Sequence, residues 1–199
     1  MKVRQARYVK SGTAPSHYPP ADLPEVAFAG RSNVGKSSLM NALLQRKNLV
    51  RVSSTPGRTQ LLSWFEVNQS MRVCDLPGYG FAKVPAAMRA GWQTMVGTYL
   101  ERRDCLLALA ILIDVRRGFK DDDLGLVEAC SAYGLQPILV GTKIDKLKPN
   151  ALYNQKRAIA KAVGADPERD IVWTSASTGV GRDALWSRIT ALLPDESSA

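Results

Sequence analysis

The sequence lacks the features of a membrane-spanning or secreted, disulfide-bonded protein. Its most extended apolar stretch, residues 106–113, ends at Asp114 and falls far short of the roughly 20 residues that cross a bilayer. The N-terminus has no apolar segment followed by a small-residue cleavage site, as a secretory signal would. The cysteines are far apart within apolar stretches, so we expect buried free thiols rather than disulfides or a zinc site at Cys74, Cys105 and Cys130. We therefore expect a cytoplasmic protein without a membrane partner.

Histidine is scarce, and acidic residues are missing from one long segment. The single histidine, His17, lies in a proline-rich segment, where we expect a surface residue rather than a catalyst. No Asp or Glu occurs between residues 26 and 65, and the whole chain carries 27 Lys and Arg against 18 Asp and Glu, a net charge of +9. A bound nucleotide accounts for part of this charge, and the remainder favours a polyanionic partner, RNA. The alternative is that the cations only keep the protein in solution.

The composition, with 45% hydrophobic and 23% charged residues in 199, is that of one globular domain. Residues 1–22 are basic and proline-rich and predict a loosely attached arm, residues 23–194 the domain, and residues 195–199 a disordered tail. Segment 25–29 is almost wholly apolar, which is typical of a parallel strand covered on both faces. The expected strands are 25–29, 61–68, 71–75, 106–114, 136–142 and 170–174, and the expected helices are 36–45, 86–102, 120–133, 149–163 and 181–193.

Residues 30–37 fit the phosphate-binding pattern G-x-x-x-x-G-K-[ST] between an apolar strand and a helical segment. This arrangement points backbone N–H groups and the positive helix end at one spot, where a polyphosphate is held. Gly30 and Gly35 allow close backbone approach, Lys36 supplies a positive charge, and the Ser37 hydroxyl is a candidate Mg²⁺ ligand. The alternative is a glycine-containing turn before an ordinary helix.

Two further segments are expected to lie near this loop and to contact the metal and the phosphates. Residues 49–60 show neither helical nor alternating character and predict a loop that would close over the phosphates. Asp75 ends an apolar strand and Gly78 follows it closely. The carboxylate would hold the metal through water while the Gly78 N–H meets a terminal phosphate. Alone, such an Asp-to-Gly turn is a weak signal.

Base selection is expected just beyond the strand 136–142. The Asp145 carboxylate would accept hydrogen bonds from N1–H and the exocyclic amine of guanine, whereas adenine would leave it facing an acceptor. The Lys143 stem would lie along the base, and backbone N–H groups around Ser175 would reach the base carbonyl. The alternative for Asp145 is a helix-capping role.

Taken together, residues 30–37, Thr59, 75–78, 142–145 and 175–176 resemble the motifs of translation-factor-like GTPases. The sequences Gly-Arg-Ser-Asn-Val-Gly-Lys-Ser, Thr-Pro-Gly-Arg-Thr-Gln and Asp-Leu-Pro-Gly-Tyr-Gly are similar to those of the bacterial EngB (YihA/YsxC) family. The resemblance covers nearly the whole chain. It implies a Ras-like three-layer α/β P-loop GTPase fold, with helices on both faces of a six-stranded, mostly parallel sheet that has one antiparallel edge strand.

The resemblance also implies GTP, GDP and Mg²⁺ binding and a role in assembly of the large ribosomal subunit, with ribosomal RNA as partner and an association with normal cell division and septation. Residues 57–61 would form a first switch and 75–83 a second. Ser37 and Thr59 would ligate Mg²⁺. The implied nucleotide-binding residues are Gly30, Arg31, Ser32, Asn33, Val34, Gly35, Lys36, Ser37, Gly57, Arg58, Thr59, Gln60, Leu61, Asp75, Leu76, Pro77, Gly78, Thr142, Lys143, Ile144, Asp145, Thr174, Ser175 and Ala176.

One position departs from the pattern of many GTPases. Tyr79 stands where a water-orienting Gln often follows the glycine, so unaided hydrolysis is expected to be slow. Asn33 matches an asparagine that helps hold K⁺ in related potassium-dependent GTPases, and it joins Lys36 and Thr59 as a catalytic candidate. The alternative is that Asn33 only caps the loop.

The function expected from the sequence is a GTPase switch, monomeric and without a DNA partner, that docks on a ribosomal precursor. A nucleotide-gated RNA-binding protein with incidental hydrolysis is the second hypothesis. An ATP-dependent small-molecule kinase is the third, and Asp145 argues against it.

Overall fold

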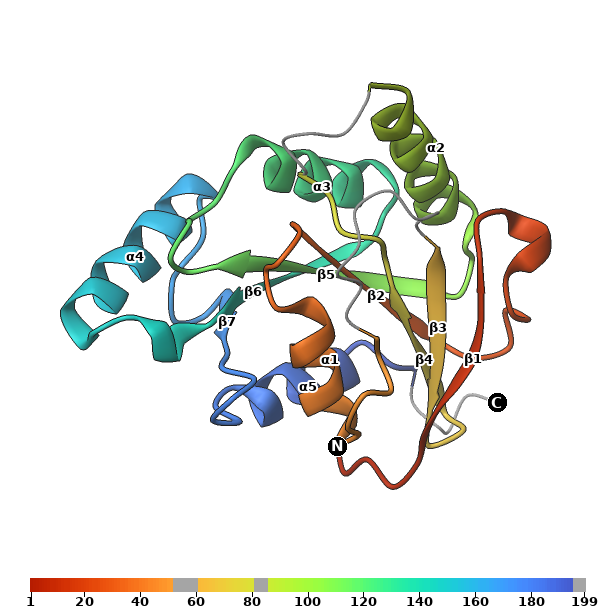
Figure 1. Ribbon diagram of the computed structural model, residues 1–199, viewed down its shortest axis with the longest axis horizontal. Coiled ribbons are helices and arrows are strands. Elements are labelled where there is room, and N and C mark those ends of the chain that lie inside the picture. Colours follow the sequence, from red (N-terminus) through yellow and green to blue (C-terminus); the bar gives the residue numbers. More distant parts are fainter. Residues whose placement is uncertain (52–60, 81–85, 195–199) are drawn as a thin grey trace.

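The computed structural model describes residues 1–51, 61–80 and 86–194. Within these residues a seven-stranded sheet runs in the order β1-β3-β4-β2-β5-β6-β7, with helices on both faces (Figure 1). The strands are β1 (Ala6–Gly12), β2 (Glu25–Gly30), β3 (Leu62–Val67), β4 (Met71–Asp75), β5 (Leu106–Asp114), β6 (Gln136–Thr142) and β7 (Ile171–Trp173). The α-helices are α1 (Lys36–Leu44), α2 (Ala86–Arg102), α3 (Asp121–Ala132), α4 (Pro149–Ala162) and α5 (Arg182–Thr190), with short 3₁₀ turns at Pro15–His17 and Ile144–Lys146.

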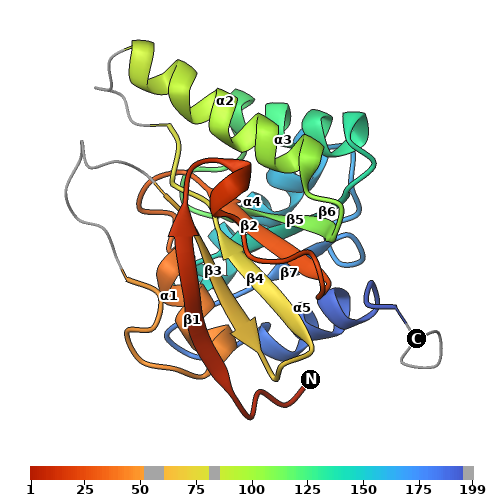
Figure 2. The ribbon, with the colours of Figure 1, turned by 90° about the vertical axis from the view of Figure 1, so that its right-hand side faces the viewer.

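The two faces of the sheet are covered by different helices because alternate residues of the central strands point in opposite directions. Val26 and Phe28 of β2 face a core shared with α1 and α5. Ala27 and Ala29 face a second core shared with α2, α3 and α4. Both views show α2 and α3 on the side of the sheet opposite to α1 and α5 (Figures 1 and 2). The expected three-layer α/β fold is confirmed.

The expected count of six strands is wrong by one, because part of the N-terminal arm forms β1. This strand pairs antiparallel with β3, from Ala6 opposite Val67 to Gly12 opposite Leu62, and lies at the edge of the sheet (Figure 2). β3 also pairs antiparallel with β4. The pairs β4–β2, β2–β5, β5–β6 and β6–β7 are all parallel. The arm therefore lies against the domain over these residues rather than loosely beside it.

A buried polar cluster anchors the segment that joins β1 to β2. Glu25 is 0% exposed and accepts hydrogen bonds from Trp64 Nε1 at 2.9 Å and Arg103 Nη2 at 2.8 Å. The Arg103 Nη1 donates in turn to the carbonyl of Pro19 at 2.8 Å. Buried charges are tolerated when they are paired in this way. The pair holds the proline-rich segment against the end of the sheet where β2 begins.

Candidate nucleotide-binding site

The segment between β2 and α1 has the backbone geometry that its sequence predicts. A Cβ on Gly30 would lie 2.7 Å from Val34 Cγ1 and 3.1 Å from Leu112 Cβ, so only glycine fits there without displacement. Gly35 has φ +101° and caps the N-terminus of α1, a conformation that favours glycine. The first-turn N–H groups of α1 and the loop before it therefore face outward at the carboxyl end of the sheet, where ligands of open α/β sheets bind.

Two charged side chains from different elements meet at this loop. Lys36, the first residue of α1, forms an ion pair with Asp75, the last residue of β4. The two side chains are 10% and 16% exposed, so both charges lie in a partly dry environment, where electrostatic interactions are stronger than in water. The structure thus brings together the predicted phosphate-binding lysine and the predicted metal-sensing aspartate.

The segment after Asp75 lies directly against the phosphate loop. The Ser32 N–H donates to the carbonyl of Tyr79 at 2.9 Å, and a Cβ on Gly78 would lie 3.3 Å from Ser32 Oγ. Leu76 is buried, and its N–H donates to the Phe28 carbonyl at 3.0 Å. A phosphate held by the loop would therefore lie within reach of the 75–80 backbone.

The first predicted switch is placed only in part. Gly57, Arg58, Thr59 and Gln60 lie outside the described residues, as do the last three residues, 81–83, of the second predicted switch. Leu61 is exposed. Ser37, in the first turn of α1, donates through Oγ to the Arg51 carbonyl at 3.4 Å.

The predicted base-binding residues come together from β6 and β7. The Thr142 Oγ1 donates to the Val34 carbonyl at 2.8 Å, which ties the end of β6 to the phosphate loop. The Lys143 ammonium donates to the Asn33 carbonyl. Both Asn33 and Lys143 have left-handed backbones, with φ 64° and 62°. Such conformations cost about 1–3 kcal/mol each and cluster at ligand sites.

Asp145 is held as an ionised acceptor. Its Oδ1 accepts a hydrogen bond from Ser175 Oγ at 2.7 Å, and its Oδ2 lies 2.9 Å from Lys146 Nζ. The hydrogen bond from Ser175, followed by that from Lys146, lowers the pKa of Asp145 to about 2. Because each carboxylate oxygen has two acceptor positions, the group retains capacity to accept from a base edge. The structure thus brings the predicted residues Asp145 and Ser175 into contact.

Asp114 is a site residue that sequence reasoning missed. It ends β5, and its Oδ2 lies 3.0 Å from Lys143 Nζ and 2.7 Å from Arg116 Nη2. Burial raises the pKa of Asp114, but the hydrogen bonds from Arg116 and Lys143 outweigh it and bring the pKa to about 2. The carboxylate fixes the Lys143 side chain next to Gly35, whose added Cβ would lie 3.3 Å from Lys143 Cε. The available signal was an acid at the carboxyl end of a buried strand.

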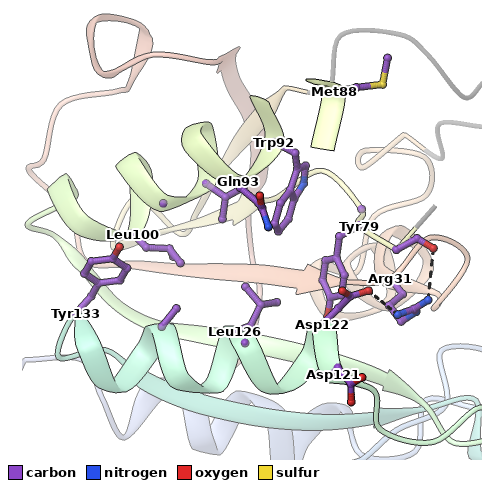
Figure 3. A pocket seen from close by; sticks show the side chains of 16 residues that line it. Arg31, Tyr79, Met88, Trp92, Gln93, Leu100, Asp121, Asp122, Leu126 and Tyr133 are labelled. Carbon is purple, nitrogen blue, oxygen red and sulfur yellow. Dashed lines mark hydrogen bonds and ion pairs between the residues drawn. The ribbon is translucent and has the colours of Figure 1, made fainter. Parts of the chain in front are cut away.

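Tyr79 points into the interior between α2 and α3, beside Arg31 of the phosphate loop (Figure 3). Its hydroxyl donates to Asp123 Oδ1 at 2.6 Å, and its ring packs on Trp92 with centroids 5.5 Å apart. Burial, followed by the charge of Asp123, raises the pKa of Tyr79, so the hydroxyl stays protonated. The tyrosine at the place of a water-orienting glutamine therefore anchors the 75–80 segment to α3.

A cavity of about 580 Å³ lies beside Tyr79, between α2 and α3. Figure 3 shows Trp92 and Leu100 from α2 and Leu126 from α3 pointing into it. At one end Arg31 of the phosphate loop pairs with Asp122 of α3, with 2.7 Å between Nη1 and Oδ2. The cavity wall is thus shared by the phosphate loop, the 78–80 segment and both helices.

A family model described as "50S ribosome-binding GTPase" matches residues 25–143. A "Probable GTP-binding protein EngB" from Geotalea daltonii is 47% identical over 198 residues, which is 100% of this chain and 95% of that protein. The chain belongs to the EngB family of GTP-binding proteins. An EngB relative from Geobacter metallireducens is 49% identical over 193 residues, 97% of this chain and 94% of that protein.

Solved structures agree with this family. A crystal structure of "a probable GTP-binding protein engB" has a TM-score of 0.70 at 22% identity and covers 84% of this chain and 97% of that chain, which supports the fold. A crystal structure of Era in complex with MgGDPNP and nucleotides 1506–1542 of 16S ribosomal RNA has a TM-score of 0.64 at 26% identity over 87% of this chain and 57% of that chain. These matches place the chain among GTP-binding GTPases, a family whose members bind guanine nucleotides.

None of the helices in the described parts of the chain is long and apolar enough to cross a bilayer.

Proposed function

We propose that this EngB-family protein is a GTP-hydrolysing switch that acts in assembly of the large ribosomal subunit, in the cytoplasm and as a monomer. The observation that carries this proposal is the match of residues 25–143 to a family described as 50S ribosome-binding GTPases. That range includes the phosphate loop, Asp75 and Lys143. The Era structure, which holds an RNA fragment of the ribosome, supports a ribosomal partner for a protein of this fold.

The phosphate side of the nucleotide would be held by the backbone of residues 30–37 and by the Lys36 ammonium. Oxygen atoms are the ligands that Mg²⁺ prefers. Ser37 would supply one hydroxyl and Thr59 a second, while the Asp75 carboxylate would hold the metal through water. Bound Mg²⁺ would neutralise charge on the phosphates. Lys36, now paired with Asp75, would turn its ammonium toward the phosphates.

The base would be selected at the other end of the site. The ionised Asp145 would accept from N1–H and the exocyclic amine of guanine, and Ser175 would keep the carboxylate oriented through its 2.7 Å hydrogen bond. Lys143, fixed by Asp114 at 3.0 Å, would lie along the base. Adenine offers an acceptor where guanine offers N1–H, so GTP is expected to bind far more tightly than ATP.

Hydrolysis is proposed to be slow without K⁺ or a ribosomal partner. Tyr79 has no carboxamide, and its hydroxyl is bonded to Asp123, so it does not align a water molecule. Asn33 stands in the loop with a left-handed backbone, and its side chain is exposed and available to K⁺. If Asn33→Ala hydrolyses GTP as fast as wild type at every K⁺ concentration, the K⁺ part of the proposal fails.

Co-sedimentation with ribosomal subunits tests the function directly. Wild-type protein is expected to travel with the large subunit in the presence of GTP or a non-hydrolysable analogue and to dissociate in GDP. Binding that is the same in GTP, GDP and the analogue would contradict the switch. The second hypothesis, a nucleotide-gated RNA-binding protein with incidental hydrolysis, would then require that nucleotide-free protein fails to bind. Equal affinity for GTP and ATP in competition would contradict the guanine assignment.

We propose that the protein also supports normal cell division and septation, through the supply of ribosomes. A defect in large-subunit assembly would lower the supply of ribosomes and so delay division. Depletion of the protein is then expected to lower the amount of mature large subunits before septa are affected. Septation defects at normal subunit levels would contradict this order.

A further inference from the structure

We propose that the N-terminal arm and the loop after α1 form one docking surface for the phosphodiester backbone of RNA. This surface, the arm–loop patch, consists of Lys2, Arg4, Arg46, Lys47 and Arg51. The proposal deepens the proposed function and rests on it for the class of partner.

The arm is fixed to the domain at the patch. Val3 is 6% exposed and packs in the same core cluster as Leu44 and Val50. Asn68, in the turn between β3 and β4, accepts from the Arg4 N–H at 2.8 Å and donates to the Lys2 carbonyl at 2.9 Å. With Val3 pointing inward and its neighbours held by their backbones, Lys2 and Arg4 are exposed on the surface.

The loop after α1 lies beside the arm and is equally well held. The Arg46 Nη2 donates to the Arg4 carbonyl at 2.8 Å. The Asn41 side chain forms two hydrogen bonds with the Val50 backbone: it donates to the carbonyl at 2.8 Å and accepts from the N–H at 2.9 Å. Lys47 and Arg51 are exposed along the loop, so the cations sit on an ordered backbone.

The charge of the patch is uncompensated within the described residues. Residues 1–21 and 26–65 contain no Asp or Glu, and none of the ion pairs found among the described residues involves a patch side chain. By contrast, Arg7 on β1 pairs with Glu66 at 2.8 Å. On the α4 side of the molecule, Lys156 pairs with Glu168 at 3.4 Å.

Phosphodiester chains fit this surface better than a lipid surface does. Cations spread along two adjacent segments can contact successive phosphates and gain binding free energy by releasing counterions. Membrane insertion would need apolar side chains at the same place, and within the described segments 1–5 and 45–51 Met1 is the large apolar residue that is exposed. The patch ends at Arg51, whose carbonyl accepts from Ser37 Oγ at 3.4 Å, so bound RNA would lie next to the phosphate end of the nucleotide site.

The test compares two triple variants of the full chain that remove equal charge. The patch variant is Lys2→Gln, Arg4→Gln, Lys47→Gln, which keeps Arg46 because its guanidinium holds the arm. The matched control is Lys148→Gln, Arg157→Gln, Lys161→Gln, at exposed positions on and beside α4. The probe is a fluorescein-labelled RNA hairpin from the large-subunit ribosomal RNA, titrated across a salt series by anisotropy.

Each phosphate contact contributes about 0.7–0.9 to the slope of log affinity against log salt. Losing three contacts is therefore expected to lower the slope by about 2 and the affinity at about 0.1 M salt by tenfold or more, whereas the α4 control stays within about twofold. An unchanged slope in the patch variant, or an equal loss in the control, would overturn the proposal. So would tighter binding of the wild type to phosphatidylglycerol vesicles than to the hairpin at the same salt.

Two further measurements separate this proposal from the proposed function. Binding of a fluorescent GTP analogue is expected to be unchanged in both variants, which shows that they are folded. If wild type co-sediments with large subunits in GTP and the patch variant does so equally well, the patch is wrong while the ribosomal function stands. If wild type never co-sediments, the proposed function fails, and the hairpin slopes still decide whether the patch binds RNA.

Discussion

Replacing Tyr79 by phenylalanine tests whether this residue anchors the loop or takes part in hydrolysis. The change removes only the hydroxyl, which donates to Asp123 Oδ1 at 2.6 Å. The ring keeps its contact with Trp92 at 5.5 Å between centroids. Asp123 is 1% exposed, and its other oxygen accepts from the Lys120 N–H at 2.9 Å. The variant therefore leaves a buried carboxylate with one partner fewer.

A hydrogen bond to a charged group contributes about 1.5–3 kcal/mol, and this is the expected loss in the free energy of unfolding at pH 7. Burial raises the pKa of Asp123, and the hydrogen bond from Tyr79 lowers it. A carboxyl group with a raised pKa in the folded state favours folding below its unfolded pKa and loses that contribution as the pH rises. Removing the hydroxyl raises the pKa further, so the variant is expected to be penalised more at pH 7 than at pH 4.

Urea unfolding followed by tryptophan fluorescence at both pH values measures the loss, and phosphate release measures hydrolysis. With an m-value of about 1–3 kcal/mol/M, the midpoint is expected to fall by roughly 1 M at pH 7. Hydrolysis at saturating GTP is expected to stay within about twofold of wild type. A double-mutant cycle with Asp123→Asn should give a coupling energy of about 1 kcal/mol or more.

A Tyr79→Phe protein that unfolds like wild type but hydrolyses GTP at least tenfold more slowly would contradict the anchoring role. That result would give the hydroxyl a part in the reaction instead of in the anchor. Equal destabilisation at pH 4 and pH 7 would show that the ionised Asp123 is not the partner that matters.

Three other changes test the site and the fold. Asp145→Asn replaces a carboxylate acceptor by an amide and is expected to weaken GTP binding by about 30-fold or more. The variant is also expected to favour a base that has a carbonyl in place of the exocyclic amine. Competition between GTP and xanthosine triphosphate measures both effects. Asp114 has a pKa of about 2, so its contribution to stability is present above pH 4 and is lost as the pH falls toward 2. Between pH 5 and pH 2 the free energy of unfolding of Asp114→Asn, measured in urea, is expected to fall by about 2 kcal/mol less than that of wild type. Arg103→Leu leaves Glu25 buried without its cation and is expected to lower the free energy of unfolding by about 3–5 kcal/mol, and a Leu variant as stable as wild type would show that the pair is dispensable.

The elements with their own periodicity or turn chemistry were predictable from the sequence. Residues 30–37 carry strand, glycine turn and helix in one continuous segment, and the structure has β2 and α1 on either side of them. The expected helices at 86–102 and 149–163 appear as Ala86–Arg102 and Pro149–Ala162. In each case the signal is local, because it depends on residues within a few turns of one another.

The features that were missed depend on contacts between distant segments. β1 has no apolar alternation because none of its residues before Gly12 is buried and the register shifts between Tyr8 and Lys10, so the strand is specified by its pairing with β3. The role of Asp114 follows from the register of β5 and β6, which places it opposite Thr142 and so next to Lys143. The side-chain direction of Tyr79 depends on Asp123 of α3. None of these partners could be assigned from spacing along the chain.

The strand order has a consequence for synthesis on the ribosome. One half of the sheet, β1-β3-β4-β2, is built from residues 6–75, and the other half, β5-β6-β7, from residues 106–173. The pairings within the first half, β1 with β3, β3 with β4 and β4 with β2, need no residue beyond Asp75. The phosphate loop belongs to the first half and Asp145 follows a strand of the second half. The hydrogen bond from Thr142 Oγ1 to the Val34 carbonyl, at 2.8 Å, joins the two halves. A nascent chain therefore contains its whole phosphate loop well before the residues that would distinguish one purine from another have been synthesised.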